Sequence, residues 1–508
     1  MRGICTMKQK NLICILLILA MSIVPVFAAS CGDGKGGTID DEEKNGGAGE
    51  DQSNEDDTLL DEAGEKLLYD PKFSPVDMGG YEFTVSTRDD DMPYHLYPAH
   101  TRDIYAEAEN GDLINDAVYR RNTAIEEKYN CKIVMMAYPE TNEAAGNQIV
   151  EKSAKAGDKS FDLITTHMMM GFNTATMGAF YDIASFPNID IRKPYWNHGA
   201  NEGCSVGHKL YIGLSDFSIS SNESLYCIFF NKQLAQNYGM EDPYKLVGEN
   251  NWTFDKFNQL IRQGYSDLNG NAKVDADDQF GYVNSNSLNF LWAGGGQMTK
   301  KDEDDIPYFD FMSQRVIDIY AKALDITIND FTYSSGQWHI EPSIGIFQEG
   351  RTLFFSNQLC RVNNLRATEF EFGIVPYPKF DSAQERYYSY VDGHASMMAI
   401  PINLPNLEWT GMLIEELSYI SYKDIMPVYY DVVLNVKLVR DEESVEMLKI
   451  LFDSKVFDPA YVMGLGLWTT WITNIESKKT EIVSTYEKME NSLNRDMTKK
   501  IDALLALE

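Results

Sequence analysis

Three short segments in the first third of the chain decide its fold class: Tyr81-Glu-Phe-Thr-Val-Ser-Thr87, Cys131-Lys-Ile-Val-Met-Met136 and Phe161-Asp-Leu-Ile-Thr165. Each alternates apolar and polar residues or runs apolar for a few positions, which is typical of a β-strand. Apolar residues recur at helical spacing from Ile114 to Tyr129, and a second helical stretch precedes Phe161. Strands and helices that alternate in this way form parallel sheets with crossover helices, so the sequence predicts an α/β fold.

The same alternation continues through the rest of the chain. Further strands are predicted at Leu210–Leu214, Leu225–Phe230, Thr352–Phe355, Phe372–Val375 and Met397–Ile400. Further helices are predicted over 254–261, after a Thr253 cap, over 316–324 and over 475–501. Since 508 residues exceed what one hydrophobic core usually holds, we expect two lobes.

The composition limits the classes of partner. Hydrophobic residues make up 44% of the chain, which is enough to fill a core and excludes wholesale disorder. The formal net charge is −33, and no basic stripe offsets it. Because so acidic a chain is repelled by phosphate backbones, the sequence argues against a nucleic-acid partner.

The N-terminus carries a secretion signal. Basic residues precede the apolar run Leu12–Phe27, and small residues at 28–30 lead into Cys31. The run is shorter than a comfortable membrane span of about 20 residues, so we interpret residues 1–30 as a signal peptide. Small residues directly before a cysteine resemble a bacterial lipobox, which predicts acylation of Cys31. Ordinary cleavage nearby is the alternative.

Residues 31–68 are predicted to be a disordered acidic tether. Acidic residues far outnumber basic ones here, and apolar residues are few. Such a segment cannot bury enough apolar surface to order itself, and its like charges extend it. We therefore place it between a lipid anchor and the folded body.

One acidic loop matches the spacing of a calcium site. Oxygen-bearing groups fall at alternate positions: Asp267, Asn269, Asn271, the Lys273 carbonyl, Asp275 and Asp278. Alternate residues of such a loop can turn oxygens towards one hard cation. Position 6 is Ala272, where EF-hand loops carry glycine. The sequence thus leaves two alternatives open for this loop, a structural Ca²⁺ site and a solvated acidic loop. We expect that the protein requires no cofactor.

Catalytic templates are absent from the sequence, whereas candidate ligand contacts are numerous. There is no G-x-S-x-G, H-E-x-x-H, P-loop or strand-linked G-x-G-x-x-G motif. Sugars are recognised by aromatic rings beside hydrogen-bonding side chains, and several strand ends carry both kinds of residue. The candidate ligand-binding residues are Thr165, Thr166, His167, Asp216, Phe217, Trp292, Trp338, Arg361, Asp392 and His394. For any single tryptophan, a core position is the alternative.

The order of short motifs resembles one protein family. The motifs are Asn115–Asn122, Phe161–His167, Lys193–Asn197, Phe230–Lys232, Trp252–Phe254, the loop from Asp267 to Gly281, Phe347–Gly350, Phe372–Lys379 and Arg440–Ser444. Together they cover most of the chain from Tyr81 to Asp458. In this order they resemble the family 1 extracellular solute-binding proteins of sugar ABC transporters, in the lipoprotein branch common in Firmicutes.

This resemblance implies a type II periplasmic-binding-protein-like fold, with two α/β lobes joined by a hinge and a ligand cleft between them. Residues 69–223 and 375–420 would form the first lobe and residues 224–374 the second. The helices of 421–508 would pack mainly on the second lobe.

The resemblance also implies a function without catalysis. The protein would be a monomer, lipid-anchored through Cys31 to the outer face of the cell membrane. It would capture an oligosaccharide and deliver it to the permease subunits of an ABC transporter. Two alternatives remain open: a peptide-binding receptor of the same fold, and a secreted glycoside hydrolase, whose two carboxylates can lie far apart in sequence.

Overall fold

The computed structural model describes residues 58–60, 66–68, 70–90, 100–139, 144–334, 340–434 and 442–507. All of these residues belong to one compact unit that begins at Asp56. The predicted signal peptide, Cys31 and Trp338 lie outside the described residues. Within the predicted tether, β1 (Thr58–Leu60) and β2 (Lys66–Leu68) pair as an antiparallel hairpin.

The first sheet is built from the three segments that decided the fold class. They form β3 (Tyr81–Arg88), β4 (Cys131–Tyr138) and β5 (Leu163–His167), with β3 parallel to both of the others. The crossover helices are α1 (Leu113–Tyr129) and α2 (Ala145–Ala156). A late strand, β14 (Ser396–Ala399), pairs antiparallel with β5 and completes the order β14-β5-β3-β4. The predicted β-α-β-α-β series is confirmed.

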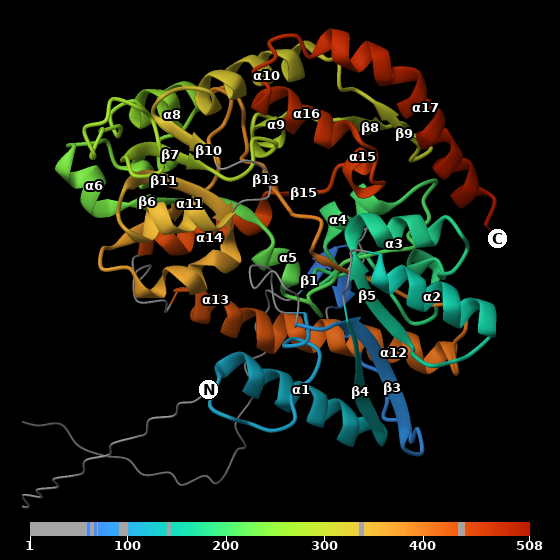
Figure 1. The fold of residues 1–508 in the computed structure, drawn as a ribbon. Helices are drawn as coiled ribbons and strands as arrows, with labels where there is room; N and C mark the ends of the chain where they lie inside the picture. The colour runs from blue at the N-terminus through green and yellow to red at the C-terminus, as the bar shows by residue number, and fades with distance from the viewer. Residues whose placement is uncertain are drawn as a thin grey trace, which may run out of the picture. The chain divides into compact units, whose positions relative to one another are not determined.

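The second sheet has five strands in the order β10-β7-β11-β6-β12. Their bounds are β6 (Tyr226–Asn231), β7 (Phe280–Asn284), β10 (Thr332–Ser334), β11 (Thr352–Gln358) and β12 (Phe372–Val375). β7 runs parallel to β10 and β11, whereas β6 is antiparallel to β11 and β12. The two sheets and their helices form the two sides of the ribbon in Figure 1.

Sequence signals position the helices around these sheets. Asp112 caps α1 by accepting hydrogen bonds from the backbone of Ile114 and Asn115. The predicted Thr253 cap begins α8 (Phe254–Ile261), whose apolar face is buried. α10 (Gln314–Thr327) and α11 (Ile340–Gln348) follow in the same lobe. The predicted strand at Leu210–Leu214 is wrong, because that segment makes only an isolated bridge from Gly213 to Met398.

The chain passes between the sheets where three segments lie together. α5 (Ser220–Glu223) leads into β6, β13 (Ser389–Tyr390) leads towards β14, and β15 (Lys455–Val456) pairs with β13. The first two are joined by a bridge from Leu225 to Val391. This convergence brings residues far apart in the sequence to one junction between the sheets.

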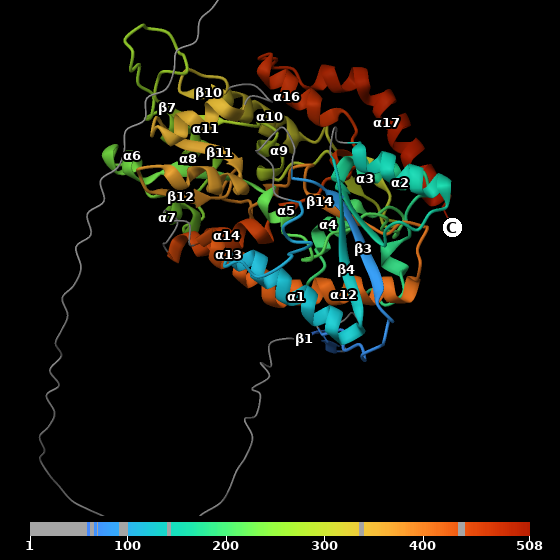
Figure 2. The ribbon, with the colours of Figure 1, turned by 60° about the horizontal axis from the view of Figure 1, so that its bottom comes forward.

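The C-terminal part is helical, as predicted. It contains α12 (Leu407–Ile420), a π-helical turn η3 (Ser421–Ile425), α13 (Met426–Leu434), α14 (Glu442–Asp453), α15 (Pro459–Val462), α16 (Leu467–Glu476) and α17 (Val483–Leu505). Near its start, Tyr486 of α17 packs on Phe309 and Phe311. Near its end, the Leu507 carbonyl accepts a hydrogen bond from Lys209. α17 therefore contacts β9 (Pro307–Phe309) and the residues after it near its start and the segment after α4 (His198–Cys204) near its end; Figure 2 shows the helix from a second direction.

The remaining elements are short. They are α3 (Met168–Ala175), η1 (Ile183–Ser185), α4 (His198–Cys204), α6 (Lys232–Asn237), α7 (Pro243–Gly248), α9 (Asn289–Ala293), β8 (Thr299–Lys301), β9 (Pro307–Phe309) and η2 (Leu359–Ala367). None of the described helices is both long enough and apolar enough to cross a bilayer.

Candidate functional site

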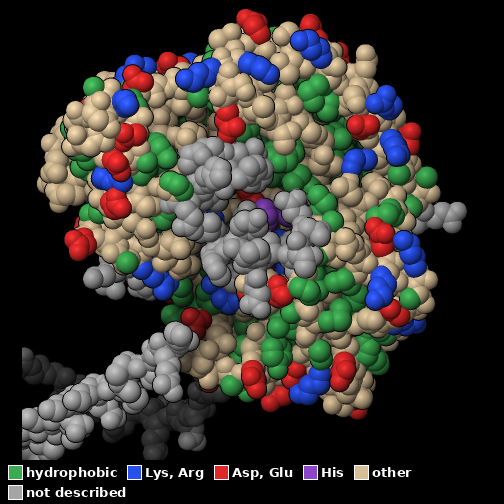
Figure 3. Space-filling view, in the orientation of Figure 1, with side chains coloured by type: hydrophobic (Ala, Val, Ile, Leu, Met, Phe, Trp, Pro, Cys, Tyr) green, Lys and Arg blue, Asp and Glu red, His purple; other side chains and the backbone are tan. Residues whose placement is uncertain are grey.

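The ends of neighbouring strands place polar side chains at the junction between the sheets. β3 ends at Arg88 and β5 ends at His167, and because the two strands are parallel both ends meet at one edge of the first sheet. His394 lies in the turn that enters β14. We call Arg88, His100, His167, Asp392, His394 and Ser396 the histidine group. Figure 3 shows a histidine recessed near the centre of one face of the molecule.

Arg88 donates hydrogen bonds to two other members of the histidine group. Its guanidinium donates to the His394 carbonyl at 2.6 Å and to the Ser396 hydroxyl at 2.9 Å. His100 Nδ1 lies 2.9 Å from the Ser396 hydroxyl and 3.3 Å from Arg88 Nη2. Since arginine can only donate, His100 Nδ1 is an acceptor and the ring is neutral. Burial and the Arg88 charge both hold the pKa of His100 well below its ordinary value.

His394 is fixed by its neighbour Asp392. Its Nδ1 lies 2.6 Å from the Asp392 carboxylate, which also accepts from the His394 backbone at 3.0 Å. Burial alone would raise the pKa of Asp392, but the His394 hydrogen bonds and the Arg361 charge bring it below its ordinary value. Asp392 is therefore an ionised acceptor, not a proton donor.

His167 is the least satisfied member of the histidine group. Its side chain is 1% exposed and packs edge to face on His394, with ring centroids 4.9 Å apart. Within the described part of the chain, neither ring nitrogen has a hydrogen-bond partner. Burial and the charges of His394 and Arg88 lower its pKa well below the ordinary value. Buried polar atoms without partners are rare in folded proteins, so His167 indicates a place where another molecule can supply them.

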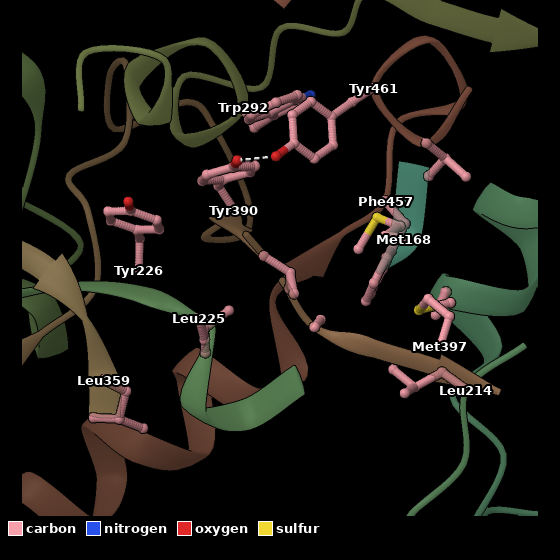
Figure 4. Packing of buried hydrophobic residues seen from close by; sticks show 14 of the residues in the cluster. Met168, Leu214, Leu225, Tyr226, Trp292, Leu359, Tyr390, Met397, Phe457 and Tyr461 are labelled. Atoms are coloured by element: carbon pink, nitrogen blue, oxygen red, sulfur yellow. Dashed lines mark hydrogen bonds between the residues drawn. The ribbon is translucent and has the colours of Figure 1, made fainter. Parts of the chain in front are cut away.

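An aromatic stack lies next to the histidine group. It consists of Tyr226, Trp292, Tyr390 and Tyr461, which Figure 4 shows from close by. Trp292 and Tyr390 are nearly parallel, at 12° with 4.8 Å between centroids, and Tyr226 stacks on Tyr390 at 5.2 Å. The Trp292 indole donates to Asp458 at 3.2 Å, which fixes the plane of its ring. Trp468, which is half-buried, packs edge to face on Tyr461 at 5.8 Å.

Gly393 joins the stack to the histidine group. Its backbone nitrogen donates to the Tyr461 hydroxyl at 3.0 Å, and Tyr461 also hydrogen bonds to Tyr390. A Cβ at position 393 would lie 2.9 Å from the His167 ring and 3.0 Å from the Tyr461 hydroxyl. Glycine at this position therefore permits His167 and Tyr461 to approach the same turn. Aromatic faces, hydrogen-bond acceptors and a buried arginine thus lie within one site.

Arg361 follows β11 on the second-sheet side of the junction. The side chain is buried, and it donates to the Gln358 amide oxygen at 3.0 Å and to the Asn357 amide oxygen at 3.2 Å. Its charge acts on Asp392, so it belongs to the electrostatic surroundings of the histidine group.

Other predicted ligand residues have different surroundings. The Thr165 hydroxyl lies 2.6 Å from the Thr87 hydroxyl between strands, and Thr166 packs against Gly146 and Gly171. Phe217 is buried beneath the Arg121 guanidinium, 5.1 Å from its ring centroid. These three side chains therefore make contacts that serve the first lobe.

Asp216 lies apart from the histidine group. It lines a cavity together with Lys455, and its backbone nitrogen donates to the Tyr195 carbonyl at 2.8 Å. The sequence predicted that Asp216 and Asp392 contact one ligand, but Asp392 is not among the described residues that line the cavity at Asp216.

The predicted calcium loop is held by its own hydrogen bonds. The Asp267 carboxylate accepts from the backbone of Gly270 at 2.7 Å and of Ala272 at 2.9 Å. Ala272 has a φ of 58°, the left-handed conformation for which glycine is usual at position 6. Across the described residues, no cluster of three or more His, Cys, Asp or Glu side chains has the geometry of a metal site. Calcium at this loop stays a prediction.

Sequence reasoning missed several members of the site. Arg88 and His100 were not predicted, although Arg88 directly follows the predicted strand Tyr81–Thr87. Tyr226 and Tyr461 were also missed, because aromatic residues in apolar runs are usually core residues. The signal that could have found Arg88 is its position, since it ends a strand parallel to the one that ends at His167.

Comparison with known proteins identifies the fold. No protein-family model matches the chain, and no curated protein matches its sequence. It is similar in structure to a cyclo/maltodextrin-binding protein complexed with maltotetraose, with a TM-score of 0.53 and 14% identity over 83% of this chain and 97% of that one. It is also similar to UspC from M. tuberculosis, with a TM-score of 0.54 and 14% identity; the match covers 82% of this chain and 100% of UspC.

A third similar structure is a sugar transporter protein from Rhizobium etli in an open conformation, with a TM-score of 0.52 and 13% identity over 84% and 100% of the two chains. These matches extend over nearly the whole of each known chain. The predicted fold class is confirmed: this chain has the two-lobed α/β fold of the ABC-transporter solute-binding proteins.

Proposed function

We propose that this protein is an extracytoplasmic solute-binding receptor that captures a carbohydrate at the junction between its two sheets and delivers it to an ABC-transporter permease. The observation that carries the proposal is His167, whose buried ring nitrogens have no partner among the described residues. Sugar hydroxyl groups donate and accept hydrogen bonds and can supply what His167 lacks. The aromatic stack lies beside His167, and aromatic rings are a usual partner for the apolar side of a sugar once the site opens.

The solved structures that share the fold support the same class of ligand. One is complexed with maltotetraose, and a solute-binding protein from Thermotoga lettingae with a TM-score of 0.51 is bound with α-D-tagatose. Because the histidine group and the stack are nearly buried, ligand entry requires that the lobes separate. A ligand that binds the closed form more tightly would then shift the population towards it.

The lipid anchor and the permease belong to the proposal on sequence grounds. Cys31 follows the small residues that end the signal sequence, and the acidic segment after it separates the anchor from the folded unit. Acylation can be measured by detergent phase partition of cells that express the chain. We expect Cys31→Ser to move the protein from the detergent phase to the aqueous phase, whereas partition unchanged by this substitution contradicts the anchor.

Isothermal titration of the full chain against mono- and oligosaccharides tests the ligand class. The diagnostic variant is His167→Phe, which keeps a planar ring and removes both nitrogens. It should weaken sugar binding by about tenfold or more, since hydrogen bonds to a buried site are lost. His198→Phe is the matched control, because His198 is exposed on α4, and it should bind as the parent does.

Trp468→Ala extends the test to the aromatic side of the site. Trp468 is half-buried and packs edge to face on Tyr461, at the border of the aromatic stack. Removal of a stacking partner worth about 1 kcal/mol should weaken binding roughly fivefold. Binding of peptides but of no sugar would favour the peptide receptor. Release of shorter sugars during the titration would favour the hydrolase and overturn the proposal of a non-catalytic receptor.

A further inference from the structure

A second polar cavity lies away from the histidine group and the aromatic stack. It has a volume of about 440 Å³ and opens between α12, η3, α13 and the segment that precedes α5. Tyr419, Tyr422 and Tyr430 are among its walls, and Asp216, Asn222 and Lys455 are among its polar groups. Its volume falls within the range of roughly 300–1,000 Å³ that is usual for small-molecule sites. No described residue of the histidine group or of the stack lines it.

Asn222 is among the residues that line this cavity, and its side chain contains a buried acceptor without a partner among the described residues. Its side chain is 2% exposed, and its amide nitrogen contacts the Met426 sulfur at 3.9 Å. The amide oxygen has no hydrogen-bond partner in the part of the chain that the structure describes. A buried amide oxygen left without a donor costs free energy, so this atom indicates a missing donor.

Asp216 and Lys455 present opposite charges to the same cavity. Within the described residues, the Asp216 carboxylate accepts no hydrogen bond, and Lys455 is its electrostatic partner without forming a direct ion pair. The Lys455 ammonium lies 3.3 Å from the Ser221 hydroxyl and over the Phe452 ring. Each of the two charges therefore retains hydrogen-bonding capacity for another molecule.

We propose that this cavity is a second ligand site, which takes a small zwitterion with one ammonium and one carboxylate, such as a free α-amino acid. The ammonium would donate to the Asp216 carboxylate, and a rotation of the Asn222 side chain would bring its buried amide oxygen to the same ammonium. The carboxylate would accept from Lys455. A zwitterion thus satisfies the acceptors and the donor without adding net charge.

The release of protons on binding is a separate measurement that tests the proposal, because it depends on the ionisation of Asp216 and Lys455. Burial raises the pKa of Asp216 to about 7, although Lys455 attracts the ionised form. Burial lowers the pKa of Lys455 to about 8, although Asp216 and Asp453 favour its charged form. Lys423 of η3 and Tyr430 of α13 also face the cavity. Because a bound ammonium favours the Asp216 carboxylate, binding at pH 7 should release protons into the buffer.

Calorimetry with the full chain tests the site. The probes are L-alanine, L-leucine and L-phenylalanine, with n-propylamine and propionate as single-charge controls and glucose as a neutral polyol. We expect an amino acid to bind and each single-charge probe to bind at least about tenfold more weakly. The apparent enthalpy at pH 7 should differ between buffers of different ionisation enthalpy, in the sense of proton release.

Three variants make the test specific. Asp216→Asn should weaken amino-acid binding by roughly ten- to a hundredfold and abolish the proton release, since it removes the charged acceptor. Asp424→Asn, on the exposed face of η3, is the matched control and should change neither. His167→Phe should leave amino-acid binding intact, which separates this cavity from the sugar site.

The proposal is overturned by any of three results. The first is that no amino acid gives a heat or a thermal shift in a parent chain that is folded by circular dichroism. The second is that Asp216→Asn binds as the parent does. The third is that glucose, rather than an amino acid, depends on Asp216.

Discussion

Glu415 is a buried acidic residue and Asp216 is a half-buried one; both lie next to Tyr195, but their carboxylates have opposite surroundings. Glu415 on α12 accepts from the Tyr195 hydroxyl at 2.8 Å and the Trp196 indole at 3.0 Å, and it pairs with Lys193 at 3.1 Å. Asp216, whose backbone nitrogen bonds to the Tyr195 carbonyl, has no donor on its carboxylate within the described residues.

The difference separates a structural carboxylate from a candidate ligand group. A buried charge surrounded by donors holds its neighbours in place, because removal of any partner leaves the rest unsatisfied. A charge that faces a cavity without donors contributes little to folding, and its unused acceptors remain for a ligand. Residue type alone would have classed the two residues together.

Replacement of Glu415 is the strongest test of the distinction between a structural carboxylate and a candidate ligand group. Glu415→Gln keeps the shape of the side chain but removes the charge opposite Lys193. It also places an amide N–H group where the Tyr195 hydroxyl or the Trp196 indole donates to a carboxylate oxygen. We expect the free energy of unfolding to fall by about 3–5 kcal/mol. Chemical denaturation of the full chain measures this loss, and a loss below about 1 kcal/mol would remove the distinction.

A control on the same helix isolates the effect of burial. Glu408 lies in the exposed first turn of α12, where its carboxylate accepts from Asn188 at 2.9 Å. Glu408→Gln should cost less than about 1 kcal/mol.

The pH dependence of the free energy of unfolding tests the protonation states in the histidine group. The pKa values of His100 and His167 lie well below the ordinary value in the folded chain. As the pH falls through about 6.5, the unfolded chain takes up protons at these residues that the folded chain does not, so stability is lost towards acid. Two such residues give a slope of about 2.7 kcal/mol per pH unit.

Denaturation midpoints between pH 7 and pH 5 measure this slope, and His167→Phe should remove about half of it. An unchanged slope in this variant would show that His167 is protonated in the folded chain. His208→Gln, which removes an exposed histidine, serves as the control substitution.

The smallest effect on stability is expected at Asp216. Burial raises its pKa to about 7, above the unfolded value, so the ionised carboxylate opposes folding as the pH rises towards 7 and above. Asp216→Asn at pH 8 should therefore leave the free energy of unfolding unchanged or raise it by up to about 1 kcal/mol. If Asp216→Asn lowered the melting temperature as much as Glu415→Gln does, both residues would be structural carboxylates.

Sequence patterns predicted the fold because the strands obey local rules. The segments at Tyr81, Cys131 and Phe161 have the alternation or apolar run of buried parallel strands, and all three lie in the first sheet. The segment Leu210–Leu214 has a similar apolar run but forms no strand. Its backbone bonds go instead to Asp182, Asn201 and Met398, and partners of this kind cannot be read from local sequence.

The candidate site was only partly predictable, because it depends on which loops meet. His167, Asp392 and His394 were predicted from polar residues next to strands, and the structure brings these three together. Asp216 carried the same sequence signal but lies at a different cavity. The Gly393 contacts that join His167 to Tyr461 depend on tertiary packing, for which one sequence provides no pattern.

The long C-terminal helix has a mechanical consequence for lobe movement. α17 has 23 residues, which corresponds to a rod of about 34 Å. Tyr486 fixes one end of this rod to Phe309 and Phe311, and the Leu507 carbonyl fixes the other end to Lys209. In the proposed receptor, such a rod would resist any movement that changes the spacing of its two attachment points. The Lys209 attachment would then help to limit how far the segment after α4 can move away from β9.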